Sequence, residues 1–307
     1  MRMFCIAILI SLACLLISAS TLAADENIAV GKPALFDPAP SYGLCTDPED
    51  HLQLTDGKFA GEGFWIDKLA VGWSSATSIS ITFDLGSIQP ISGAMYSTSS
   101  RGNAGVTWPR SLFIFVSDDG NTYRYVGDLV ALDRKNGIPE IEEEKEVRHQ
   151  FKTNELQTHG RYVRISTLPN GPYTFVDEIE IYKGQESFLT QTQTEEVVKD
   201  IKSFTEKQMQ KSSIMDRLAR DIADIREKIS KSKASHAVKK SLLAKLAESE
   251  KRVDYLPTPD ADTFKAILPL NDVHESIYAV YGELMQQLKQ PVITLWKKHR
   301  YDSLRMF

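Results

Sequence analysis

Several stretches of the chain alternate apolar and polar residues, which is the pattern of a β-strand with one buried face. Residues 79–85 read Ile-Ser-Ile-Thr-Phe-Asp-Leu, so every second side chain is apolar. Residues 112–116 read Leu-Phe-Ile-Phe-Val and are apolar on both faces, as in the middle of a sandwich. Residues 118–121, Asp-Asp-Gly-Asn, predict a hairpin turn, because Gly and Asn tolerate the positive φ that such turns need. The return strand is expected to begin at residues 122–126.

From about Glu186 the apolar residues recur every three to four positions, which predicts amphipathic helices. The first helix is expected from Glu186 onward, either continuous or broken near residues 211–213. Two more are expected at about 235–255 and 272–288, each followed by proline. The apolar positions of the first are Val197, Ile201, Phe204, Leu218, Ile222, Ile225 and Ile229. This repeat is too short for a coiled coil, so the pattern predicts a helical hairpin or three packed helices.

The distribution of glycine separates these two regions. Sixteen of the 17 glycines lie before residue 185, and Gly282 is the exception. Turns in a β-sandwich need glycine, whereas helices avoid it. We therefore expect a β-rich domain at 25–184 and an α-helical hairpin or bundle region at 185–307.

Residues 1–24 have the order of a signal peptide. Arg2 supplies the positive charge, residues 4–17 are apolar, and small residues follow, with cleavage expected near Ala23 or Ala24. A membrane anchor is the alternative, but the apolar run is shorter than the roughly 20 residues of a spanning helix. The sequence thus predicts an exported protein that is secreted, periplasmic or on the cell surface, with no transmembrane segment after cleavage. Cys45 alone remains in the cleaved chain, which excludes an internal disulfide.

Six segments, in order, resemble the coagulation factor 5/8 type C, or discoidin, domain. They begin with Asn-Ile-Ala-Val-Gly-Lys-Pro at 27–33 and Leu-Thr-Asp-Gly-Lys at 54–58. The others are residues 79–86, 108–123, 161–165 and 177–182. The resemblance covers about 25–184 and implies a β-sandwich of the galactose-binding-like jelly-roll type. Animal members usually tie their ends with a disulfide, and this chain departs from that pattern.

The resemblance also implies a structural calcium site. Domains of this kind often hold Ca²⁺ between an Asp-Gly loop and a Glu at the start of the last strand, positions that match Asp56 and Glu178. Carbonyl oxygens of Lys58 or Gln53 would complete a shell of about six to eight oxygens. The alternative is a metal-free domain in which Asp56 caps a turn and Glu178 is an exposed strand residue.

The ligand of such domains sits on loops at one end of the sandwich. The resemblance makes Arg101 and Asn103 the candidate donors, with Tyr173 or Tyr42 as a stacking ring and His51 nearby. A surface ion pair is the alternative for Arg101, and His51 is expected to be simply exposed. Two tryptophans at strand starts, Trp73 and Trp108, are predicted to belong to the core.

No catalytic motif is found in the sequence. Gly-x-Ser-x-Gly and His-Glu-x-x-His are absent, and none of the six histidines pairs with another at metal-ligand spacing. Asp177 and Glu178 are adjacent, so a strand would direct them to opposite faces, which excludes a paired acid and base. We therefore expect a protein that is not an enzyme.

Charge narrows the choice of partner. Residues 1–184 hold 15 Lys and Arg against 23 Asp and Glu, whereas residues 185–307 hold 21 against 18. An acidic β-domain is poorly suited to binding nucleic acid or anionic lipid, because both of these partners require a basic protein surface. The sequence predicts an exported, non-catalytic binding module that recognises carbohydrate. The alternatives are the accessory N-terminal part of a larger carbohydrate-active enzyme, and a protein-binding adhesion or envelope scaffold that uses its C-terminal helices.

Overall fold

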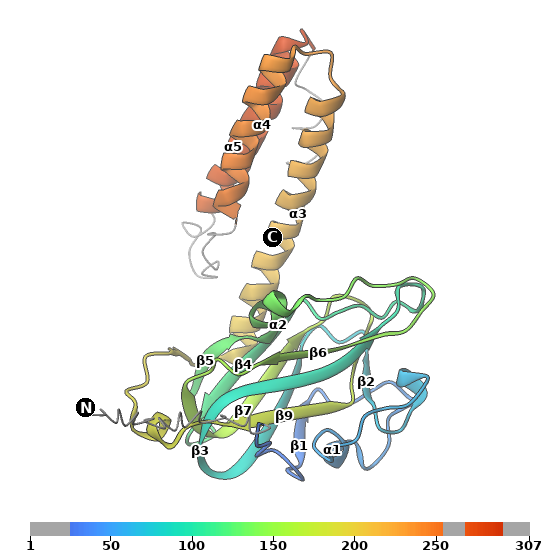
Figure 1. Cartoon of the computed structure of the whole chain (residues 1–307), viewed down its shortest axis with the longest axis vertical. Coiled ribbons are helices and arrows are strands. Elements are labelled where there is room, and N and C mark those ends of the chain that lie inside the picture. Colours follow the sequence, from blue (N-terminus) through green and yellow to red (C-terminus); the bar gives the residue numbers. More distant parts are fainter. Residues whose placement is uncertain (1–24, 254–267, 291–307) are drawn as a thin grey trace, which may run out of the picture.

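The computed structural model describes residues 25–253 and 268–290, and it has a β-sandwich from which helices project (Figure 1). The expected signal peptide lies outside these residues. The strands are β1 (Ala34–Asp37), β2 (Val71–Ser74), β3 (Ile79–Ser100), β4 (Ser111–Ser117), β5 (Tyr123–Asp128), β6 (Val147–Thr153), β7 (Thr158–Leu168), β8 (Tyr173–Val176), β9 (Glu178–Lys183) and β10 (Glu196–Val198). The α-helices are α1 (Asp50–Gln53), α2 (Leu129–Asp133), α3 (Ile201–Lys231), α4 (His236–Val253) and α5 (Leu268–Gln287), and 3-10 helices span Phe64–Ile66, Gly102–Ala104, Arg134–Asn136 and Glu186–Thr190.

The long strand β3 belongs to both layers of the sandwich. Its first half pairs with β1 and β7, and its second half pairs with β6 and β9. The register shifts between Asp84 and Gln89, which separates the two halves. The first layer has the order β1-β3-β7-β4-β5-β10, and β2 and β8 form a separate pair. All pairings are antiparallel, so the β-sandwich expected from the sequence is confirmed.

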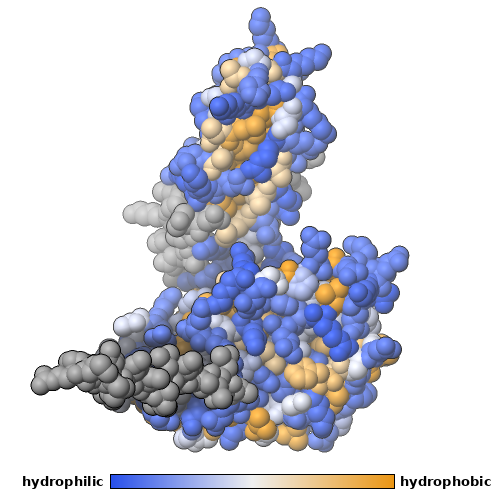
Figure 2. Space-filling model, viewed as in Figure 1, coloured by the Kyte–Doolittle hydropathy of each residue, from blue (hydrophilic) through white to orange (hydrophobic). Residues whose placement is uncertain are grey.

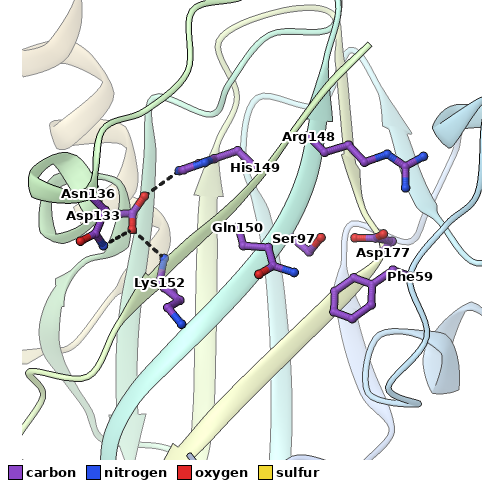
Figure 3. A pocket seen from close by; sticks show the side chains of 9 residues that line it. All are labelled: Phe59, Ser97, Asp133, Asn136, Arg148, His149, Gln150, Lys152 and Asp177. Carbon is purple, nitrogen blue, oxygen red and sulfur yellow. Dashed lines mark hydrogen bonds and ion pairs between the residues drawn. The ribbon is translucent and has the colours of Figure 1, made fainter. Parts of the chain in front are cut away.

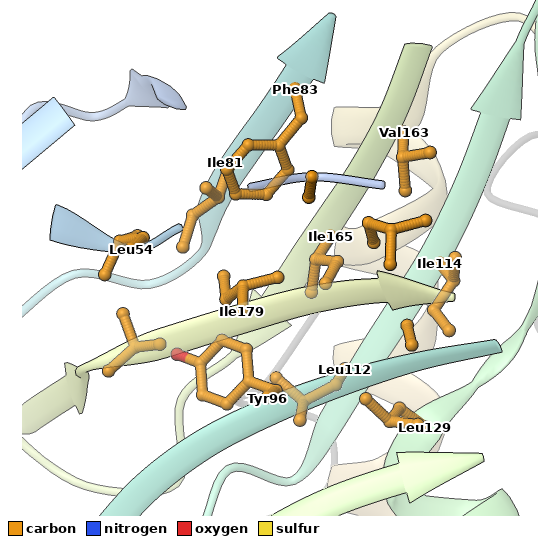
Figure 4. Close-up of a cluster of buried hydrophobic side chains, with 14 of the residues drawn as sticks. Leu54, Ile81, Phe83, Tyr96, Leu112, Ile114, Leu129, Val163, Ile165 and Ile179 are labelled. Atoms are coloured by element: carbon orange, nitrogen blue, oxygen red, sulfur yellow. The ribbon is translucent and has the colours of Figure 1, made fainter. Parts of the chain in front are cut away.

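The core lies between the two layers and consists of the apolar side chains that alternate along the strands (Figure 4). Ile81 pairs with Ile165 in one layer, and Tyr96 pairs with Ile179 in the other. Trp73 and Trp108 are also buried, as predicted. The domain therefore has one continuous core of aliphatic and aromatic side chains.

Strand β4 is buried on both faces, as predicted. One face packs in the core of the sandwich, and the other is covered by a helix rather than by a second sheet. Phe113 and Phe115 point away from the sandwich core. The ring of Phe204, in the first turn of α3, lies 5.6 Å from Phe113 and 5.4 Å from Phe115 between centroids. The start of the helical region is thus packed on the outer face of the first layer.

The first helix begins later than the sequence pattern indicated. Helix α3 starts at Ile201, after Asp200 accepts a hydrogen bond from the Ser203 N–H at 3.0 Å. The expected start near Glu186 is wrong, because residues 196–198 form β10 and extend the sheet beside β5. The helix runs unbroken through residues 211–213, so the broken alternative is wrong too.

Helices α3, α4 and α5 pack against one another, which confirms the predicted helical packing. Leu218, Ile225, Leu246 and Ile277 belong to their shared core. In Figure 2 apolar side chains form a stripe along the middle of this helical part, between hydrophilic edges. Among the described helices, none has the length and apolar character required to cross a membrane.

Truncation of Phe204 should weaken the junction between sandwich and helices. Phe204→Ala removes a half-buried ring that contacts three aromatic side chains. We expect the free energy of unfolding to fall by about 2–3 kcal/mol, below the range for a fully buried Phe. Urea unfolding of the whole chain measures this, and Met209→Ala, at an exposed position of the same helix, is the control. Equal midpoints for the two variants would contradict the packing described here.

Candidate functional site

The loop that follows β3 is short and closed by its own backbone. Arg101 N–H donates to the carbonyl oxygen of Val106 at 2.8 Å, and Val106 N–H donates back to Arg101 at 3.2 Å. Gly105, at φ +69°, allows the chain to turn between them. Residues 101–106 are therefore held as a defined loop at one end of the sandwich.

Two tyrosines from distant segments lie at the same end. Val106 forms a parallel bridge with Tyr173, at the start of β8. The ring of Tyr173 lies 5.5 Å from that of Tyr42, edge to face, and Tyr42 lies 4.8 Å from Phe175. The structure therefore brings the loop of residues 101–106, Tyr173 and Tyr42 to the same end of the sandwich.

Arg101 has unused hydrogen-bonding capacity. Its Nε atom is buried and has no hydrogen-bond partner in the described chain. No ion pair involving Arg101 was found among the described residues, so nothing supports the surface-ion-pair alternative. A buried donor without a partner is unfavourable by about 1–3 kcal/mol, which a water or ligand oxygen would relieve.

The two remaining candidate binding residues, Asn103 and His51, lie in different parts of the domain. Asn103 is exposed on the same loop, where its N–H donates to the Glu143 carbonyl oxygen at 3.0 Å. His51 is exposed on α1, and its Nδ1 lies 3.0 Å from the Pro48 carbonyl oxygen. None of the contacts of His51 within the described residues reaches the Arg101 loop.

Three further residues at this end, Trp65, Arg148 and Glu146, have no role predicted from the sequence. Trp65 is half-buried and packs in the same cluster as the two tyrosines. Arg148 donates to the carbonyl oxygens of Ala60 and Gly61, and Glu146 accepts from the backbone of the same loop. The sequence identifies Trp65 as an aromatic residue in a loop. Its neighbours in space come from other segments of the chain, and the periodicity of the sequence does not identify those neighbours.

The proposed metal ligands lie where the Asp-Gly loop meets β9. Glu178 is 0% exposed, and its carboxylate accepts from the Gly57 N–H at 3.2–3.3 Å. Asp56 accepts from both the N–H and the ammonium of Lys58, at 2.9 and 3.0 Å. The expectation of an exposed Glu178 in the metal-free alternative is wrong, because the loop covers this side chain.

The environment of Glu178 suits a cation. Burial, together with the charge of Asp56, raises the pKa of Glu178 to about 8, although the hydrogen bond from the Gly57 N–H opposes the shift. No basic side chain pairs with Glu178 within the described residues. No cluster of three or more His, Cys, Asp or Glu side chains occurs in this part of the chain either, so backbone carbonyls would supply most ligands. Carboxylate and carbonyl oxygens are the ligands that calcium requires, and calcium binding by Asp56 and Glu178 stays a prediction.

The carboxyl groups of Asp177 and Glu178 both reach the loop at residues 57–60, whereas a regular strand would direct them to opposite faces. Asp177 lies between β8 and β9, and its Oδ2 accepts from the Ala60 N–H at 2.9 Å. Glu178 bonds to Gly57 in the same loop. The expectation of separated carboxyls is wrong, and both side chains anchor residues 57–60.

Comparisons with known proteins give solved structures and a family. The chain is similar to three solved structures: CpGH89CBM32-6 of Clostridium perfringens (21% identity, 52% of this chain and 100% of that chain, TM-score 0.32), a Streptococcus pneumoniae fucose binding module (14%, 52% and 96%, 0.34) and a fucolectin from striped bass, Morone saxatilis (16%, 52% and 50%, 0.36). A search of curated proteins found no match. Residues 46–180 match the F5/8 type C domain family. Residues 46–180 of the sandwich are therefore an F5/8 type C domain.

Proposed function

We propose that this protein is an exported, non-catalytic module that binds carbohydrate through the loops around Arg101. The observation that carries the proposal is the convergence of an unpartnered arginine donor with two tyrosine rings at one end of an F5/8 type C sandwich. Sugars present an apolar ring face and several hydroxyls. An aromatic ring can stack on the apolar face, and the planar guanidinium of an arginine can donate hydrogen bonds to neighbouring hydroxyl oxygens.

The site is open and its contacts are few. Each hydrogen bond at such a surface contributes about 0.5–1.5 kcal/mol. A single module should therefore bind with a Kd in the micromolar to millimolar range. The site offers binding groups positioned by rigid strands, and the same role would serve a free-standing protein or an accessory part of an enzyme.

Arg101→Ala should remove most of the binding without unfolding the protein. The test is a glycan array with the whole chain, followed by calorimetry with the strongest oligosaccharide on that array. We expect at least a tenfold loss of affinity for Arg101→Ala and a melting temperature close to wild type. Arg220→Ala, at an exposed arginine on α3, is the matched control.

Two results would refute the assignment. Unchanged affinity of Arg101→Ala would exclude this loop as the site. Retained affinity of Arg101→Ala with loss in His51→Ala would move the site to the first loop, around α1.

A further inference from the structure

A second polar trough lies away from the Arg101 loop, on the outer face of the layer formed by β6, the second half of β3, and β9 (Figure 3). Its volume is about 590 Å³. Small-molecule sites typically measure about 300–1,000 Å³. The trough is thus large enough for a small ligand, and none of the roles assigned above uses it.

The wall of the trough carries an incompletely bonded carboxyl group. Asp177 is 1% exposed, and its Oδ1 has no hydrogen-bond partner of ordinary geometry in the described chain. Its other oxygen, Oδ2, accepts from the Ala60 N–H at 2.9 Å. Buried polar atoms are nearly always bonded in folded proteins, so the Oδ1 atom points to a missing donor.

The floor and the rim supply complementary chemistry. Ser97 and Gln150 are direct neighbours on β3 and β6, so a hydroxyl and an amide lie side by side on a rigid sheet. Phe59 stands beside Asp177 at one end, and the residue is 42% exposed (Figure 3). An exposed ring next to fixed hydrogen-bonding groups is the arrangement that a sugar ring requires.

Two of the basic side chains that line the trough, Arg148 and His149, are already paired. Arg148 bonds to Glu146 and to two carbonyl oxygens of the loop that holds Phe59. His149 lies 2.6 Å from the buried carboxylate of Asp133. Besides these pairs, the trough offers the Gln150 amide, the Ser97 hydroxyl, the Asp177 carboxyl and the exposed side chain of Lys152. One acid offsets one base in this set, which favours a neutral polyhydroxylated molecule over a phosphate or sulfate.

We propose that this trough is a second carbohydrate subsite, in which a neutral pyranose ring stacks on Phe59 and its hydroxyls bond to Gln150, Ser97 and Asp177. The inference rests on the proposed function, since it extends carbohydrate binding to another face of the same domain. Ser97 lies four positions before Arg101, which is about 13 Å along a strand. The two subsites are distinct, so each takes a ligand of its own.

Two pairs of substitutions separate the subsites. Arg101→Ala with Tyr173→Ala disables the loop site, and Phe59→Ala with Gln150→Ala disables the trough while changing only exposed side chains. Binding of the whole chain is measured by calorimetry against neutral oligosaccharides that end in galactose, fucose or glucose. Ile88→Ala, at an exposed apolar position elsewhere on β3, is the control for Phe59→Ala.

We expect two ligands per wild-type chain and one ligand for each paired variant, with no binding when all four substitutions are combined. Asp177→Asn should weaken the trough at least fivefold, and its melting temperature shows whether it remains folded. One ligand in wild type and none in the loop variant would overturn the second subsite and leave the proposed function intact. One ligand in wild type that is lost only in the trough variant would support the trough and refute the loop assignment. No binding of wild type to any oligosaccharide would overturn both.

Discussion

Glu178→Gln should stabilise the calcium-free protein at pH 8 and abolish its response to calcium. The pKa of Glu178 is raised from 4.5 to about 8 by burial. Between these values the folded state holds a proton that the unfolded state has lost. Stability must therefore fall as the pH rises from 4.5 to 8, by at most about 1.4 kcal/mol per pH unit. Glutamine is neutral throughout, so the variant should lose this slope.

Calcium should compete with that proton. A cation that binds only the native state raises stability by mass action, and its effect should be largest at pH 8, where the proton is most easily displaced. Melting temperatures at pH 5 and pH 8, with calcium or with a chelator, measure both effects. Asp56→Asn should also reduce the calcium response, whereas Glu62→Gln, an exposed acid of the next loop, should not change it.

Two observations would contradict this assignment. A wild-type stability that rises between pH 5 and pH 8 would show that Glu178 is not the dominant titrating group. An equal calcium response in wild type and Glu178→Gln would show that the ion binds elsewhere.

Gly93→Ala should destabilise the sandwich by about 3 kcal/mol or more, since it forces two strands apart. A Cβ atom at this position would lie 1.9 Å from the Thr153 carbonyl oxygen and 2.8 Å from its carbon. These are backbone atoms of the adjacent strand β6, which cannot move aside as a flexible side chain does. The register of β3, β6 and β9 would have to change, and the floor of the trough would move with it.

Urea unfolding followed by tryptophan fluorescence measures this effect. Gly43→Ala is the matched control, because a Cβ atom there meets nothing within 4 Å and its φ is not in the left-handed region. We expect a much lower midpoint for Gly93→Ala and a midpoint near wild type for Gly43→Ala. Similar midpoints for the two variants would show that β3 and β6 are not in close contact at Gly93.

Local patterns in the sequence were sufficient for the elements and the fold class. The first part of strand β3, the turn at residues 118–121 and the buried tryptophans each follow from residues that are close in sequence, whereas the continuation of β3 to Ser100 was not predicted. The helical spacing of Leu218, Ile222 and Ile225 likewise predicts α3. These features are predictable because alternation, turn chemistry and helical period express the geometry of a short backbone segment.

The start of the first helix and the element that covers the outer face of β4 could be learned only from the tertiary structure. Val197 has helical spacing relative to Ile201, yet it lies in β10, because pairing with β5 satisfies its backbone in the sheet. Phe113 and Phe115 indicated that both faces of β4 are buried, but they did not indicate that Phe204 covers the outer face. Such contacts join residues about ninety positions apart, and local propensity carries no information about them.

The sequence by itself determined the β-sandwich, the helical region and the residue types available for binding. The tertiary structure decided which of them meet: the loop of residues 101–106 lies at the same end as Tyr42 and Tyr173, whereas His51 remains apart. It also placed Asp177 at the wall of a trough that no sequence motif predicted. The physical reason is that a site is a convergence of distant segments, and its geometry is set by strand register and loop packing, which exist only once the chain has folded.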